Sequence, residues 1–216
     1  MHFTPKRVSG FTLIELLVVI GIIGLFIGSF SAAVSGGNIN TKVDSTQFQI
    51  TSLLRQARTV ALTRSTETRV IVNLAPNNSR YLTELAVIWR DNTDGVWILN
   101  SEVVVLRDGV GILPESSVPS APGVTWPGKV KSVFTGTASV DSPLTGQATY
   151  GYVGFSPRGT AILSSGGQSP QLAIGPYRPS ADGSSKEFHQ PDASVGVLLR
   201  AYGTPIELRF PAAFPN

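Results

Sequence analysis

The sequence lacks cysteine altogether, which excludes disulfide bonds and thiolate metal sites as supports for the fold. Histidine is nearly absent too, and beyond the first ten residues only His189 remains. Because His189 stands close to Pro191 in a segment predicted to be a loop, we expect a solvated loop residue and not a catalytic base.

The sequence has almost no excess of positive charge beyond its first ten residues. The formal net charge is +3, but Lys6 and Arg7 stand ahead of a long apolar run. Removing these two from the 17 basic residues leaves 15, against 14 acidic residues. This even balance gives little reason to expect a nucleic-acid partner.

Motifs of catalysis are missing as well. Ser156 stands in "GFSPRG", which lacks the Gly-x-Ser-x-Gly spacing of a nucleophile elbow and places Pro157 next to the serine. The stretch "SSGGQS" at 164–169 lacks the Lys-Ser/Thr ending of a phosphate loop. We therefore predict that the protein is not an enzyme and uses no cofactor.

The most prominent feature present is an apolar run over residues 11–34, in which Glu15 is the one charged residue. As a helix, these 24 residues extend roughly 36 Å, enough to cross a bilayer core of about 30 Å. The basic pair Lys6 and Arg7 on the N-terminal side predicts a single pass with a cytoplasmic N-terminus. The rest of the chain is then extracytoplasmic.

Glu15 sets this run apart from an ordinary signal anchor, and from a cleaved secretory signal with a site in the small residues of 29–36. A carboxylate in a bilayer costs about 2.5–3.5 kcal/mol on insertion scales, so an acid there usually has a partner. If the chain is cut between Gly10 and Phe11, the new ammonium of Phe11 heads the helix one turn before Glu15. That ammonium, from the same chain or from a neighbouring copy, is a suitable partner for the carboxylate.

The stretch "GFTLIELLVVIGIIG" at 10–24 resembles the N-terminus of type IV pilins and type II secretion pseudopilins. This resemblance implies that a membrane prepilin peptidase cuts after Gly10 and methylates the amine of Phe11. It also implies that Glu15 pairs with the N-terminus of a neighbouring subunit in a helical filament. The implied partners are the peptidase, other pilins or pseudopilins and an inner-membrane assembly platform, and the implied location is the bacterial inner membrane with a periplasmic C-terminal domain.

Beyond the apolar run, the sequence predicts an amphipathic helix followed by a β-rich domain. Apolar residues recur at three- and four-residue intervals from about 41 to 64, which indicates one buried stripe. Gly36 and Gly37 weaken a helix, so we expect a break or flexible point there; the alternative is a continuous helix that packing holds together. We divide the chain into a leader (1–10), an assembly helix (11–35), an amphipathic helix (36–66) and a β-rich domain (67–216).

From residue 69 onward the pattern changes to short runs rich in β-branched residues. About eight to ten short strands after one long helix predict an α+β fold, in which the helix packs on paired antiparallel sheets. Proline, glycine and serine predict surface loops at 114–128 and 175–194. The candidate strands are 69–74, 81–89, 96–99, 102–106, 109–113, 129–134, 150–155, 160–163, 171–174, 194–202 and 205–210.

Three elements of this region look like the domain of H-type minor pseudopilins and FimT-like minor pilins. In that family, a helix that ends in Ala-Arg-x-x-Ala precedes a strand, a Phe-x-Pro-x-Gly turn follows in mid-domain, and a glycine turn joins the last two strands. The loops at 114–128 and 175–194 depart from a compact version. The matching residues are Ala57, Arg58 and Ala61, then Phe155, Pro157 and Gly159, and finally Gly203.

Other functions stay open at this point. The stretch "DNTDG" at 91–95 could bind calcium through the carboxylates of Asp91 and Asp94. The alternative is a hairpin turn that needs no metal. A second possibility is a minor pilin that binds DNA during uptake. Its phosphate contacts would be made by basic residues at strand ends, namely Arg178, Arg200 and Arg209. A membrane-anchored binding module without a filament is a third possibility. If the protein is a pilin or pseudopilin, the sequence does not distinguish a subunit of a secretion system from a subunit of a pilus.

Overall fold

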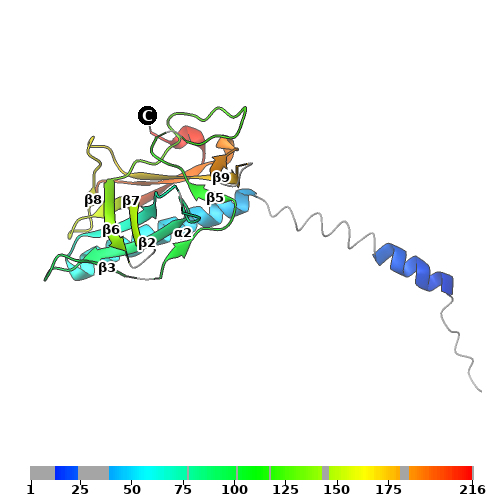
Figure 1. The fold of residues 1–216 in the computed structure, drawn as a ribbon, viewed down its shortest axis with the longest axis horizontal. Coiled ribbons are helices and arrows are strands. Elements are labelled where there is room, and N and C mark those ends of the chain that lie inside the picture. Colours follow the sequence, from blue (N-terminus) through cyan, green and yellow to red (C-terminus); the bar gives the residue numbers. More distant parts are fainter. Residues whose placement is uncertain are drawn as a thin grey trace, which may run out of the picture. The chain divides into compact units, whose positions relative to one another are not determined.

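The computed structural model describes residues 13–23, 39–76, 78–100, 102–116, 118–142, 146–180 and 185–215. The chain divides into two compact units, Met1–Asn38 and Ile39–Asn216. Figure 1 shows the helix of the first unit and the α+β body of the second. The predicted break at Gly36 and Gly37 lies outside the described residues.

Helix α2, Ile39–Arg64, confirms the predicted amphipathic helix and begins two residues earlier than expected. The helix stops before Ser65, which has a positive φ of 51°. Thr66 N donates a hydrogen bond to Ala61 O and closes the last turn. Arg64 in that turn suits the negative end of the helix dipole and stacks 4.1 Å from the Trp89 ring centroid. The buried stripe is Val43, Thr46, Gln47, Ile50, Thr51, Leu53, Leu54, Ala57, Val60 and Ala61.

Twelve strands follow in the described residues, and they form two sheets. The first sheet has the order β3-β2-β1-β7-β6, with β4 beside β2 and β8 beside β7. Its strands are β1 Thr68–Asn73, β2 Glu84–Arg90, β3 Trp97–Leu99, β4 Val104–Val105, β6 Gly136–Ser142, β7 Gly146–Phe155 and β8 Ala161–Ile162. Every strand pair in it is antiparallel, and β6 and β7 lie side by side in Figure 1.

The second sheet has the order β10-β9-β11-β12, with β5 beside β9. Its strands are β5 Val110–Ile112, β9 Gln171–Pro179, β10 Lys186–Phe188, β11 Val195–Leu199 and β12 Pro205–Leu208. These pairs are antiparallel as well. The structure thus has the predicted α+β fold with paired antiparallel sheets.

Both sheets bury an apolar face against α2. The main core joins Leu54 and Ala57 of the helix to Val70 of the first sheet and to Leu172 and Val197 of the second. Burying a leucine or valine side chain is worth about 1.5–3 kcal/mol. Gln47 adds a polar tie, because its Nε2 donates to the carbonyl oxygens of Gly196 at 2.7 Å and Leu208 at 3.1 Å.

The structure corrects one strand prediction and one loop prediction. Residues 129–134 form no strand, and Val133 pairs with β9 only at Gln171. The reason is that Leu113 and β5 occupy the same edge of β9 from Ala173 onward. In the predicted loop 175–194, β9 continues to Pro179 and pairs with β10, so part of that segment is a hairpin. Segment 114–128 contains, in its described residues, only a bridge at Ser120.

Candidate assembly site

Residues 13–23 form a helix that carries apolar side chains on all sides and Glu15 as its one charged residue. Leu13 is 82% exposed and Leu17 64% exposed, and every large apolar side chain between Leu13 and Ile23 is exposed in the isolated chain. A helix that is hydrophobic all round requires an apolar environment, either lipid or neighbouring helices. Within the described ranges, however, we find no helix with the length and hydropathy needed to cross a bilayer.

Glu15 lies in the first described turn of this helix and is exposed. Its neighbours Ile14 and Leu16 are 70% and 56% exposed, so the carboxylate stands in an apolar surface. The predicted cleavage and methylation positions, Gly10 and Phe11, lie outside the described residues.

In the second unit, three predicted sequence elements meet at one end of α2. Arg58 Nε donates to the carbonyl oxygen of Gly159 at 3.2 Å, which ties the helix to the turn between β7 and β8. Gly203, in the turn between β11 and β12, lies against the same carbonyl. We call these residues, Arg58, Gly159 and Gly203, the turn junction. It joins α2 to two turns that lie more than a hundred residues further along the sequence.

The two glycines of the turn junction are required by its geometry. Both have positive φ, 70° at Gly159 and 76° at Gly203. A Cβ on Gly203 would stand 1.9 Å from the Gly159 oxygen, and one on Gly159 would stand 2.9 Å from Leu62 Cγ. Nearby, Ala161 N donates to Ala201 O at 3.0 Å and joins the two sheets. The turn junction therefore fixes α2 against both sheets.

Ser156 is held by hydrogen bonds within a turn, and His189 is packed beside strand β10. Ser156 Oγ lies 2.6 Å from Thr160 Oγ1 within the β7–β8 turn, and Arg158 N donates to it at 3.3 Å. His189 directly follows β10 and, contrary to the prediction of a solvated residue, it is half-buried, with its Nδ1 enclosed and without a hydrogen-bond partner among the described residues.

The three arginines considered for DNA are spread along the second sheet. Arg178 stands near the end of β9 and pairs with Glu187 of β10 at 3.6 Å. Arg200 follows β11, at the end of the sheet where β9 begins, because Leu198 pairs with Gln171. Arg209 pairs with Glu207 at 3.2 Å. The strand register thus places Arg178 and Arg200 at opposite ends of the sheet.

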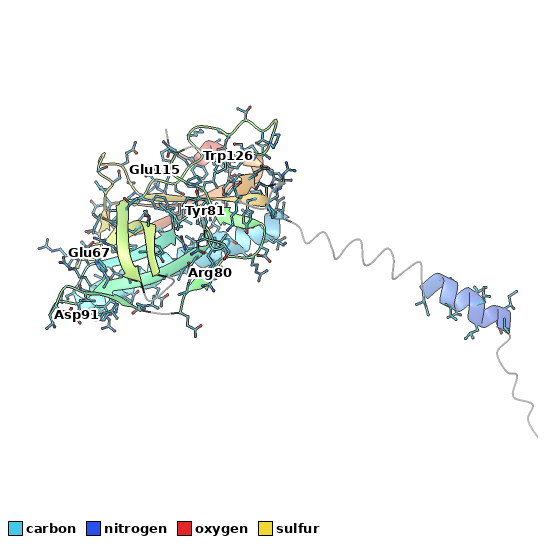
Figure 2. The ribbon with its side chains drawn as sticks, in the orientation of Figure 1. Glu67, Arg80, Tyr81, Asp91, Glu115 and Trp126 are labelled. Carbon is cyan, nitrogen blue, oxygen red and sulfur yellow. The ribbon has the colours of Figure 1, made fainter. Side chains whose placement is uncertain are left out.

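The calcium candidate forms the turn between β2 and β3, at the edge of the domain (Figure 2). Asp91 Oδ1 accepts from Thr93 N at 2.7 Å, and Asp94 Oδ1 accepts from Val96 N at 2.9 Å. Gly95 has the positive φ of 74° that such a turn needs. Across the part of the chain that the structure describes, no cluster of three or more His, Cys, Asp or Glu side chains is arranged for a metal ion.

A half-buried amine that the sequence did not single out lines a cleft of about 220 Å³. Lys186 Nζ donates to Tyr81 O at 2.5 Å and to Thr83 Oγ1 at 3.1 Å, and it lies 4.8 Å from the Tyr177 ring centroid. Burial lowers the pKa of Lys186 to about 8, against the opposing charge of Asp108. Burial also raises the pKa of Tyr81 and of Tyr177. No local signal marks Lys186, because its surroundings come from residues distant in sequence.

Comparison with known proteins supports the reading of the N-terminus. Residues 5–31 match the family model described as the prokaryotic N-terminal methylation motif. This match confirms the class of N-terminal signal predicted from "GFTLIELLVVIGIIG", the signal of type IV pilins and pseudopilins.

Two solved structures are similar to the chain. One is a crystal structure of the minor pseudopilin EpsH from the type II secretion system of Vibrio cholerae, with 12% identity and a TM-score of 0.46 over 80% of this chain and 97% of that one. A second structure of the same Vibrio cholerae protein has 12% identity and a TM-score of 0.42, over 78% and 97% of the two chains. No curated protein matches the chain.

Proposed function

We propose that the protein is a minor pilin or pseudopilin, a structural subunit of a type II secretion pseudopilus or a type IV pilus. The observation that carries the proposal is the methylation motif at residues 5–31, whose helical part is apolar and exposed on every side. Such a helix needs lipid before assembly and the helices of neighbouring subunits after it.

The proposed course begins with a precursor in the bacterial inner membrane, its C-terminal domain in the periplasm. Prepilin peptidase cuts after Gly10 and methylates Phe11. In the filament, Glu15 pairs with the N-terminal ammonium of a neighbouring subunit and thereby fixes the axial register of the packed helices. A subunit in a filament needs a rigid outer domain. The turn junction and the core around α2 fulfil this need, because they hold the helix against both sheets. The three elements that meet at the turn junction are those of the H-type minor subunits, so we propose that subfamily.

The experiment that tests the proposal is intact mass and N-terminal sequencing of the protein from its own membranes, with and without the prepilin peptidase. We expect a chain that starts at methylated Phe11 with the peptidase and an uncut chain without it. A start between residues 29 and 36 in both strains would overturn the proposal, since it would indicate an ordinary secretory signal.

A further inference from the structure

A cleft of about 590 Å³ lies on the face of the second sheet that points away from α2. Leu172 and Ile174 of β9 belong to the helix-side core, whereas Ala173 packs in a separate cluster on the other face. Strand alternation places Gln171 on the face of Ala173, opposite Leu198 of β11. The cleft has the size of sites that hold a small ligand or a few side chains.

The floor of the cleft is apolar, and one wall is basic. Val133, Leu198 and Pro215 supply apolar surface, while Lys129 and Lys131 stand on the wall formed by segment 128–133. Lys129 Nζ donates weakly to Ala212 O at 3.4 Å, and Lys131 is exposed. Among the described residues, neither lysine takes part in an ion pair. Beside its apolar floor, the cleft therefore presents two lysines that form no ion pair within the described part of the chain.

Gln171 adds an unpaired acceptor to this wall. Its side chain is almost fully buried, its Nε2 donates to Lys131 O at 2.8 Å, and its Oε1 is enclosed without a hydrogen-bond partner. A flipped amide would bring two acceptor oxygens together, so the observed orientation is the one that Lys131 O requires. Leaving a buried acceptor without a donor destabilises the folded protein. Because Oε1 has almost no accessible surface, an N–H group of an occupant reaches it only after the Gln171 side chain shifts toward the cleft.

Charge also limits where the occupant lies. A second hollow of about 430 Å³ adjoins the cleft and shares Gly128 and Lys131 with it. Glu115 lines this second hollow and does not line the cleft. An acidic occupant is therefore attracted to the side of Lys129 and repelled from the side of Glu115.

We propose that this cleft binds an acidic, extended peptide segment of a partner protein. Apolar side chains of the segment pack on Val133 and Leu198, its carboxylates meet Lys129 and Lys131, and a backbone or side-chain N–H donates to Gln171 Oε1. Peptides supply these three features together, since each residue carries an N–H group and alternate side chains face the same way. The inference stands apart from N-terminal processing, because none of these residues lies in the first unit.

The test uses the full chain in detergent and a fluorescein-labelled peptide of alternating leucine and aspartate, with fluorescence anisotropy as the readout. The control peptide carries asparagine at every aspartate. We expect saturable binding of the acidic peptide, weakened at high salt, and markedly weaker binding of the control peptide. Equal binding of the two peptides, or no binding of the acidic one, would overturn the proposal.

Charge reversal in the protein locates the site. Lys131→Glu and Lys129→Glu should each weaken binding of the acidic peptide about tenfold, since they replace attraction by repulsion. Arg55→Glu makes the same change in charge on α2, on the opposite side of the sheet, and should leave binding unchanged. Unaltered binding in both lysine variants, with melting temperatures like that of the parent, would place the peptide elsewhere and overturn the proposal.

Discussion

Arg58 Nε lies 3.2 Å from the carbonyl oxygen of Gly159, and the Cα of Gly203 packs against that same oxygen. The carbonyl oxygen of Gly159 thus accepts a hydrogen bond from helix α2 and also contacts the turn between β11 and β12. A side chain at residue 203 has no room there, so close packing at this point depends on glycine.

Gly203→Ala should destabilise the protein more than any ordinary glycine replacement. Adopting a φ of 76° costs a residue with a side chain about 1–2 kcal/mol, and the clash 1.9 Å from Gly159 O adds about 1–3 kcal/mol or more. The measurement is the free energy of unfolding by urea for the full chain in detergent.

Gly167→Ala is the matched control for this variant. Gly167 has a similar φ of 72°, but a Cβ built there meets nothing within 4 Å. It should therefore show only the backbone cost of about 1–2 kcal/mol. Equal destabilisation by the two variants would show that close packing at Gly203 contributes nothing.

Arg58→Ala should lower the free energy of unfolding by about 1–3 kcal/mol, because it removes the donor to Gly159 O from a half-buried site. Arg55→Ala, three residues earlier on the exposed face of the same helix, should stay within about 0.5 kcal/mol of the parent. The comparison uses the same urea titrations. A loss of similar size in both variants would mean that helix propensity, and not the turn junction, sets the cost.

The sequence allowed prediction of the features that depend on local patterns. The apolar spacing of α2 and the runs of β-branched and other apolar residues in β1 and β2 belong to single segments, so they can be recognised without tertiary information. The glycine turns were identified as well, through a family resemblance. Their meeting at Arg58, however, follows only from the packing of two sheets on one helix.

Features that depend on distant partners were missed. Strand β6, Gly136–Ser142, has only Thr137 and Val140 as β-branched residues among glycine, alanine, serine and aspartate, so its strand signal is weak, yet it pairs with β7 along its whole length. Segment 129–134 has strand-like composition, but other chain segments occupy the edge it would need. The burial of Lys186 likewise depends on Tyr81 and Thr83, about a hundred residues away.

The stability of the domain should rise with pH between about 8 and 10 because of Lys186. Its pKa in the folded protein is lowered to about 8 from an ordinary 10.5, so in this window the unfolded chain binds more protons at this site. Above pH 10 the trend should reverse, since the raised pKa values of Tyr81 and Tyr177 keep protons on the folded protein that the unfolded chain releases.

Melting temperatures recorded across this range test the prediction. Lys186→Met should show a flatter profile between about pH 8 and 10 than the parent, whereas Lys131→Met, at an exposed lysine, should follow the parent. If Lys186→Met and the parent have parallel profiles, the amine titrates at the same pH in the folded and unfolded chain.

Calcium should leave the melting temperature unchanged up to about millimolar concentration, the range in which extracellular calcium sites are filled. Asp91 and Asp94 each use one carboxylate oxygen to hold the β2–β3 turn, so the hairpin is complete without an ion. Thermal melts with added calcium and with a chelator make the comparison. A rise in melting temperature that Asp94→Asn abolishes would establish a calcium site at this turn.

Glu15→Val should leave cleavage and methylation largely intact but reduce incorporation into filaments about tenfold, because the variant loses the partner of the neighbouring ammonium while keeping an apolar helix surface. The matched control is Ile22→Val, which trims an exposed apolar side chain of the same helix and keeps the acid. Incorporation is measured by quantifying the subunit in sheared filament fractions against the membrane pool. A membrane-anchored binding module has no use for the carboxylate, so equal partition of Glu15→Val and the parent would remove Glu15 from the assembly mechanism.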